Sequence, residues 1–170
     1  GHPGDFAWIP STVPAGFRVE REPAPAEIVN ALREAGVEEI KNDWDRALSL
    51  VMFLIRHWKH DGPIQADLVG TFRGIMGGAG YCSDYVRVFL ASASAVGLFC
   101  RQWAFSFDGF GGHVHTVVEV FDRQRDTWNF RDEHTNVSAV GVGVSEPPSS
   151  TAWRQARVQR PVTAALPGPV

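Results

Sequence analysis

The sequence is poor in the features that define several classes of protein. Its 170 residues include only two cysteines, Cys82 and Cys100, which are too few for a disulfide framework in a domain of this size, although one bridge between them stays open. No run of about 18 apolar residues is present, so neither a membrane-spanning helix nor a membrane partner is expected. Sixteen basic and 19 acidic residues give a net charge of −3. Nucleic acid is therefore not an expected partner.

The remaining composition is that of an ordinary globular protein. Hydrophobic residues make up 44% and charged residues 21% of the chain, and the length suits one domain that buries about 70% of the surface of its unfolded chain. No signal peptide is visible, and the compartment is left open with a lean toward the cytoplasm. No cofactor is expected. His113, His115 and His134 do not have the tight spacing of a zinc site, so no metal is expected either.

The chain divides into a helical first part and a second part rich in strands. Apolar residues recur at helical spacing in the segments 26–36, 42–60, 65–75 and 83–97. They then alternate with polar residues in 98–107, 115–122 and 126–132. Helices followed by strands predict the α+β class rather than alternating α/β.

We predict three regions from these patterns. Residues 1–25 are rich in proline and are expected to be extended, with a short strand at 16–20. Residues 26–140 form the core domain. Residues 141–170 weaken into Pro, Ser and Gly and are expected to be an extension or linker with one further short element at most.

Helix 42–60 is predicted to be the longest, with Asn42 or Asp43 as its N-cap. Helical spacing places four aromatic residues in the predicted core: Trp44, Phe53, Trp58 and Phe89.

Cys82 follows the glycines of "GGAG" and precedes a helical pattern, so it is predicted to lie in or next to the first turn of that helix. The N–H groups and dipole at a helix N-terminus favour the thiolate, which is the nucleophilic form of cysteine. The plainer alternative is a packing role, because free cysteine is often buried. Cys100 is predicted to be a core residue of a strand.

Two histidines and one aspartate follow Cys82 in the order that thiol catalysis needs. His113 and His115 stand at the start of the second predicted strand and are candidate bases, while Asp132 ends the third strand. A short polar turn joins these two strands, so we expect them to pair. An imidazole near Cys82 and a carboxylate that orients it would complete a triad. Asn129 and Glu133 are alternatives to Asp132.

Four stretches resemble the motifs of the transglutaminase-like branch of the papain-like cysteine protease superfamily. Residues 80–85 (GYCSDY) resemble Gly-x-Cys-x-Asp-aromatic, and 97–101 (GLFCR) resemble Gly-Ile-Pro-Ala-Arg. Residues 115–120 (HTVVEV) are similar to His-Ala-Trp-x-Glu-Val, and 128–132 (WNFRD) match Trp-x-x-x-Asp. The resemblance covers roughly residues 44–134.

This resemblance implies Cys82 as the nucleophile, His115 as general base and acid, and Asp132 as the residue that orients it. His115 is favoured over His113 because it lies four residues before Glu119, as the motif requires. The implied fold is a papain-like transglutaminase core, in which the helix that begins at the catalytic cysteine packs on a C-terminal antiparallel sheet. The implied activity is cysteine-dependent acyl transfer, either by a protease or amidase or by a transglutaminase-like enzyme, and hydrolysis is favoured.

The expected substrate is a peptide, protein or other amide, and neighbouring domains of a longer chain are possible partners. Substrate contacts are predicted for four residues, of which Trp103 has core packing as its alternative: Tyr81, Trp103, Phe110 and His113. Val117 replaces the tryptophan of the family motif, which leaves the substrate open. Glu119 is expected to form a salt bridge, with Arg101 as the candidate partner.

The alternative function is a catalytically silent domain that binds a peptide or carbohydrate as an accessory module of a larger protein. Acyl transfer from a thioester donor, as in arylamine acetyltransferases, ranks last because those chains are longer.

Overall fold

The computed structural model describes residues 8–17, 19, 22–106, 114–132 and 137–140. At the strand ends 104–106, 114–115, 130–132 and 137–140 it describes the backbone. The predicted loop that holds Phe110 and His113 lies outside the described residues, as does the element expected after residue 141. Residues Ile9–Val142 belong to one compact unit, whereas Trp8 belongs to a second unit. The predicted boundaries of the three regions stay predictions.

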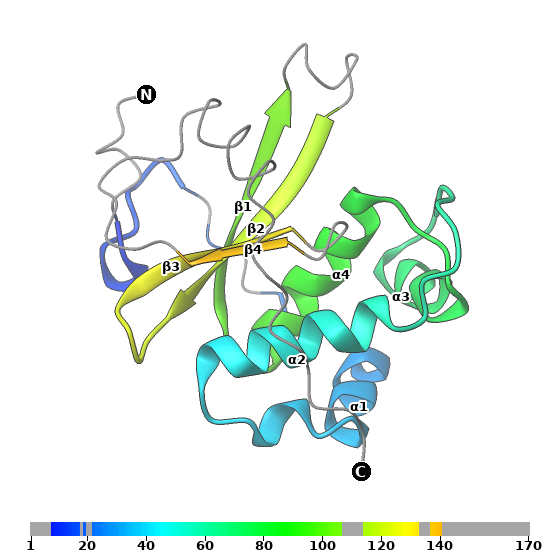
Figure 1. The fold of residues 1–170 in the computed structure, drawn as a ribbon, viewed down its shortest axis with the longest axis horizontal. Helices are drawn as coiled ribbons and strands as arrows, with labels where there is room; N and C mark the ends of the chain where they lie inside the picture. Colours follow the sequence, from blue (N-terminus) through cyan, green and yellow to red (C-terminus); the bar gives the residue numbers. More distant parts are fainter. Residues whose placement is uncertain (1–7, 18, 20–21, 107–113, 133–136, 141–170) are drawn as a thin grey trace. The chain divides into compact units, whose positions relative to one another are not determined.

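Four α-helices precede the sheet (Figure 1), which confirms the predicted helical segments but shifts their ends. They are α1 (Ala26–Glu34), α2 (Asp43–Ile55), α3 (Leu68–Gly77) and α4 (Cys82–Ala95). Two short 3₁₀ turns, η2 (Pro10–Thr12) and η3 (Val37–Glu39), complete the helical elements of the described chain. The longest of these helices is α4 with 14 residues, not α2 with 13, so that prediction was wrong.

Helix α2 begins as predicted but ends early. Asn42 is its N-cap, and its side chain accepts a hydrogen bond from the Asp45 N–H at 3.0 Å. The helix ends at Ile55 because the chain then turns away, and the N–H groups of Lys59 and His60 donate to the Gly78 carbonyl instead. Trp58 consequently lies outside the helix and is 51% exposed, so its predicted place in the core was wrong.

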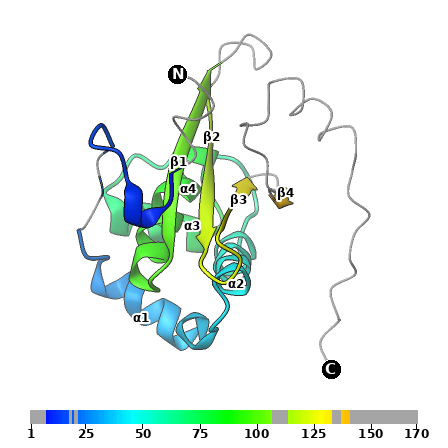
Figure 2. The same cartoon turned by 90° about the vertical axis from the view of Figure 1, so that its left-hand side faces the viewer.

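The strands form an antiparallel sheet in the order β1-β2-β3-β4. They are β1 (Phe99–Ser106), β2 (Val114–Asp122), β3 (Thr127–Asp132) and β4 (Val137–Val140), and Figure 2 shows β1 and β2 side by side. The first three strands and the turn 123–126 were predicted, whereas β4 was not. The strand expected at 16–20 was wrong: Gly16 lies in a turn, Phe17 in a bend, and Val19 in no regular element.

The core lies between the helices and one face of the sheet. Helix α4 packs against β1 and β2, and α2 packs against β2 (Figure 1). The central residues of the core are fully buried: Leu50, Leu54, Val88, Phe89, Val118 and Val120. The predicted core residues Trp44 and Phe53 are also buried. Helices packed on an antiparallel sheet confirm the α+β class. None of the described helices is long and apolar enough to cross a membrane.

An ion pair between a buried carboxylate and an exposed guanidinium joins the first turn of α2 to the turn between β2 and β3. The Asp43 side chain is fully buried, and its two oxygens accept hydrogen bonds from Nε and Nη2 of Arg123, each at 2.7 Å. The Arg123 backbone N–H also donates to Asp43 at 3.0 Å. These hydrogen bonds hold the pKa of Asp43 below its usual value, against the opposing effect of burial. We call this pair the Asp43–Arg123 clamp.

Candidate active site

Cys82 is the first residue of α4, as predicted. Tyr81 precedes it in an extended conformation, and its backbone N–H donates to the Asp84 carboxylate at 2.9 Å. The Cys82 side chain is half-buried, and neither cysteine forms a disulfide. The thiol is therefore held at a capped helix N-terminus within reach of solvent.

The turn between α3 and α4 depends on glycine for packing. Gly78 has a φ of +102° and Gly80 a φ of +141°, a region that residues with a Cβ rarely adopt. A Cβ on Gly78 would lie 2.6 Å from the His57 carbonyl oxygen, and one on Gly80 would lie 3.0 Å from the Tyr85 ring. Glycine at these positions lets the segment before Cys82 pack closely on its neighbours.

We expect Gly78→Ala to lower the free energy of unfolding by about 2–4 kcal/mol, since it adds left-handed strain to a backbone clash. Gly77→Ala is the matched control, because a Cβ there meets nothing within 4 Å and alanine favours a helix over glycine. Urea denaturation of both variants measures the difference. Equal stabilities for the two variants would contradict this account of the turn.

Two opposing electrostatic effects act on the Cys82 thiol. The N-terminus of α4 favours a thiolate by about 0.3–1 kcal/mol. The Asp84 carboxylate lies in the same helical turn and disfavours a second negative charge. Because these effects oppose each other, the helix alone does not guarantee a thiolate. A reactive Cys82 therefore needs a cationic partner from elsewhere in the chain.

The backbones of the other two predicted triad residues lie on adjacent strands. His115 is on β2 and pairs with Phe105 of β1, while Asp132 ends β3 and pairs with Val137 of β4. Val118 pairs with Arg131. The next residue of β3, Asp132, is therefore opposite Val117, which is two residues from His115 along β2. Such diagonal positions on neighbouring strands are about 7–8 Å apart.

Tyr85 lies one turn after Cys82 on α4 and is 1% exposed. Its hydroxyl has no hydrogen-bond partner among the residues that the structure describes. Burial raises the pKa of Tyr85, and the carboxylates of Asp61 and Asp84 raise it further. A Cβ on Gly62 would lie 3.9 Å from the Ala79 Cβ, so the segment after Asp61 is close to the turn that leads into α4.

Trp103, a predicted substrate contact, is part of a polar and aromatic cluster on β1 and β2. Its indole Nε1 donates to Glu119 Oε2 at 2.6 Å, and Arg101 Nε donates to the same oxygen at 2.5 Å. This confirms the expected pairing of Glu119 with Arg101. The Arg101 guanidinium also lies 4.0 Å from the centre of the Trp128 ring. Glu119 alternates along β2 with the core residues Val118 and Val120, so the cluster is on the sheet face away from α4. His115 is four residues before Glu119, so its backbone position on β2 belongs to the same face, and the proposed contact with Cys82 requires the start of β2 to bend toward α4.

The structure describes only one of the other three predicted substrate contacts. Tyr81 is 45% exposed directly before Cys82, whereas Phe110 and His113 lie outside the described residues. Within the described part of the chain, no three His, Cys, Asp or Glu side chains cluster as a metal site. The helical spacing of Trp58 predicted a core position, whereas Trp58 is exposed in the segment that contacts the turn before Cys82.

A groove of about 600 Å³ lies elsewhere, between α1, α2 and α3. Its floor includes Phe53, Phe72 and Met76, and its rim includes Glu34 and Arg56. It contains none of the predicted catalytic or substrate-binding residues.

Comparisons with known proteins give little further information. No family model matches the sequence, and no curated protein matches it. Among solved structures, the fold is similar to part of a putative cysteine protease from Cytophaga hutchinsonii, with a TM-score of 0.49 and 19% sequence identity. The similarity covers 65% of this chain and 37% of that chain. The function proposed below therefore rests on this chain's own residues.

Proposed function

We propose that the protein is a cysteine-dependent acyl-transfer enzyme of the transglutaminase-like branch, which hydrolyses an amide bond with Cys82, His115 and Asp132. The observation that carries the proposal is the position of Cys82 at the capped N-terminus of a helix that packs on β1 and β2. His115 belongs to β2, and Asp132 belongs to the adjacent β3. His115 in its cationic form is the partner that a thiolate beside Asp84 needs.

In the proposed reaction, the Cys82 thiolate attacks the amide carbonyl carbon and forms a C–S bond. Backbone N–H groups at the start of α4 stabilise the oxyanion. The C–N bond breaks as the imidazolium of His115 gives its proton to the leaving amine. His115 then takes a proton from water, whose oxygen attacks the thioester, and a carboxylic acid and the Cys82 thiolate are released. Asp132 orients the imidazole throughout.

The same acyl-enzyme would react with an amine in place of water and give transamidation. We propose hydrolysis of a peptide or protein substrate as the main reaction.

The pH dependence of Cys82 alkylation tests the proposal. In a Cys100→Ser background, we expect iodoacetamide to react with Cys82 with a midpoint well below the value of about 8.5 for an ordinary thiol. His115→Ala should raise the midpoint toward that value, because the thiolate loses its cationic partner. Mass spectrometry of quenched samples gives the rates.

His113→Ala is the control and should leave the midpoint of the wild type unchanged. An alkylation midpoint near pH 8.5 that His115→Ala does not change would contradict the proposal. The protein would then be better described as a binding module with a buried structural thiol.

A further inference from the structure

Trp58 presents a large aromatic surface to solvent on a segment that is hydrogen-bonded to the turn before Cys82. Its side chain is 51% exposed, and its indole Nε1 makes a long hydrogen bond of 3.4 Å to Asp61 Oδ1. It belongs to the segment 57–62, which we call the 57–62 loop.

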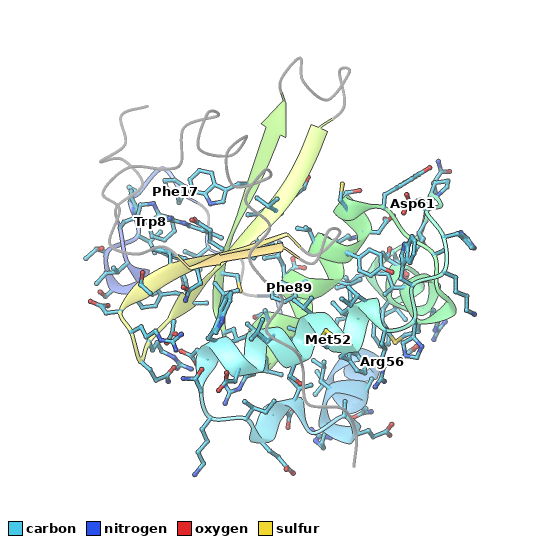
Figure 3. All side chains as sticks on the ribbon, viewed as in Figure 1. Trp8, Phe17, Met52, Arg56, Asp61 and Phe89 are labelled. Carbon is cyan, nitrogen blue, oxygen red and sulfur yellow. The ribbon has the colours of Figure 1, made fainter. Side chains whose placement is uncertain are left out.

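The 57–62 loop is attached to the turn that leads into Cys82. The N–H groups of Lys59 and His60 donate to the Gly78 carbonyl at 2.9 and 3.2 Å. Gly78 approaches the His57 carbonyl so closely that only glycine fits there. Through these contacts the loop packs on the turn between α3 and α4, and Gly78 of this turn is four residues before Cys82. Figure 3 shows Asp61 of this loop on the side of the molecule where α3 and α4 lie.

Tyr81 adds a second exposed aromatic residue to the same turn. It is 45% exposed and directly precedes Cys82. The 57–62 loop carries one cation, Lys59, and one carboxylate, Asp61. Its charge therefore favours neither an anionic nor a cationic ligand. Trp58 and Tyr81 are the large hydrophobic side chains that these two segments expose, alongside Lys59, His60 and Asp61, and their rings suit stacking and apolar contact.

We propose that Trp58 and Tyr81 bind an aromatic or large apolar side chain of the acyl donor next to the scissile amide. This inference rests on the proposed function and adds the substrate class to it. Trp58 is here a specificity-determining residue and takes no part in bond breaking.

Two alkylating probes of different size test the inference in the Cys100→Ser background. Iodoacetamide and N-benzyl-iodoacetamide react identically: the thiolate forms an S–C bond, the C–I bond breaks, and iodide leaves. We expect the ratio of the N-benzyl rate constant to the parent rate constant to exceed the ratio for N-acetylcysteine by about fivefold or more. Trp58→Ala should remove most of this excess by lowering the N-benzyl rate constant more than the parent rate constant, and Tyr81→Ala should reduce the excess.

Trp58→Phe, which keeps an aromatic ring, should retain most of the preference. Phe17→Ala is the matched control, because Phe17 is 41% exposed and lies on the opposite side of the molecule from Asp61 (Figure 3). A wild-type ratio equal to that of N-acetylcysteine overturns the inference, as does an equal loss of both rate constants in Trp58→Ala. Fast iodoacetamide labelling without an N-benzyl preference refutes the inference alone, whereas labelling independent of His115 refutes the proposed function.

Discussion

Cys82→Ser and His115→Ala should each reduce amide hydrolysis by about 10³-fold or more, and the double variant should be no slower than the slower single variant. Residues that act as one unit in a single step show this strong departure from additivity. Without the imidazole the thiolate is lost, and without the thiol the imidazole has no nucleophile to activate. A quenched fluorescent casein, with mass spectrometry of the products, measures the loss.

Cys100→Ser is the control for this experiment and should retain activity, since Cys100 packs against the core as a residue of β1. Hydrolysis that survives in Cys82→Ser would show that the activity does not belong to this site. Binding of casein or of a glycan by both the wild type and Cys82→Ser, with turnover by neither, would favour an accessory binding module.

Asp43→Asn should lower the free energy of unfolding by about 2–4 kcal/mol at pH 7. The substitution preserves the shape of the side chain but removes the charge from hydrogen bonds to Arg123, and charge-assisted bonds contribute about 1.5–3 kcal/mol each. Asp45→Asn is the matched control, because Asp45 lies in the same helical turn and is exposed. It should cost less than about 1 kcal/mol. Urea denaturation of the two variants measures this difference.

The same pair predicts a dependence of stability on pH. The pKa of Asp43 is lowered in the folded protein, so its contribution is fully present above the unfolded value of about 3.9. The contribution is lost as the pH falls below this value and passes through the lowered pKa of the folded state. Wild type and Asp43→Asn should therefore approach each other in stability as the pH falls from 5 toward 2. A constant difference across this range would contradict the assignment.

Local patterns in the sequence were sufficient for the helices, three strands and the position of Cys82. Helical spacing, glycine before the helix and an aspartate at its third position are all short-range signals, and they located the start of α4 correctly. The pairing of Glu119 with Arg101 was also predicted, because both residues belong to motifs that occur on adjacent strands.

Contacts between distant segments were beyond the same reasoning. The helical spacing of α2 continues through Trp58, and only the hydrogen bonds from Lys59 and His60 to Gly78 explain why the helix has already ended. Asp43 was predicted as a candidate N-cap, whereas its side chain forms an ion pair with Arg123, which lies 80 positions later. The catalytic roles of Cys82, His115 and Asp132 stay predictions, since no pattern of residues reports turnover.

The Asp43–Arg123 clamp also bears on the order in which the chain assembles during synthesis. Helices α1 to α4 form from neighbouring residues, and such local contacts form quickly. The clamp must wait until Arg123 has left the ribosome, because its two residues are 80 positions apart. Until then the nascent chain exposes the apolar faces of α2 and α4 that the sheet later covers, and such transient surfaces promote aggregation. Arrival of the β2–β3 hairpin would thus end the aggregation-prone interval and join the segment with the thiol to the segment with its proposed base.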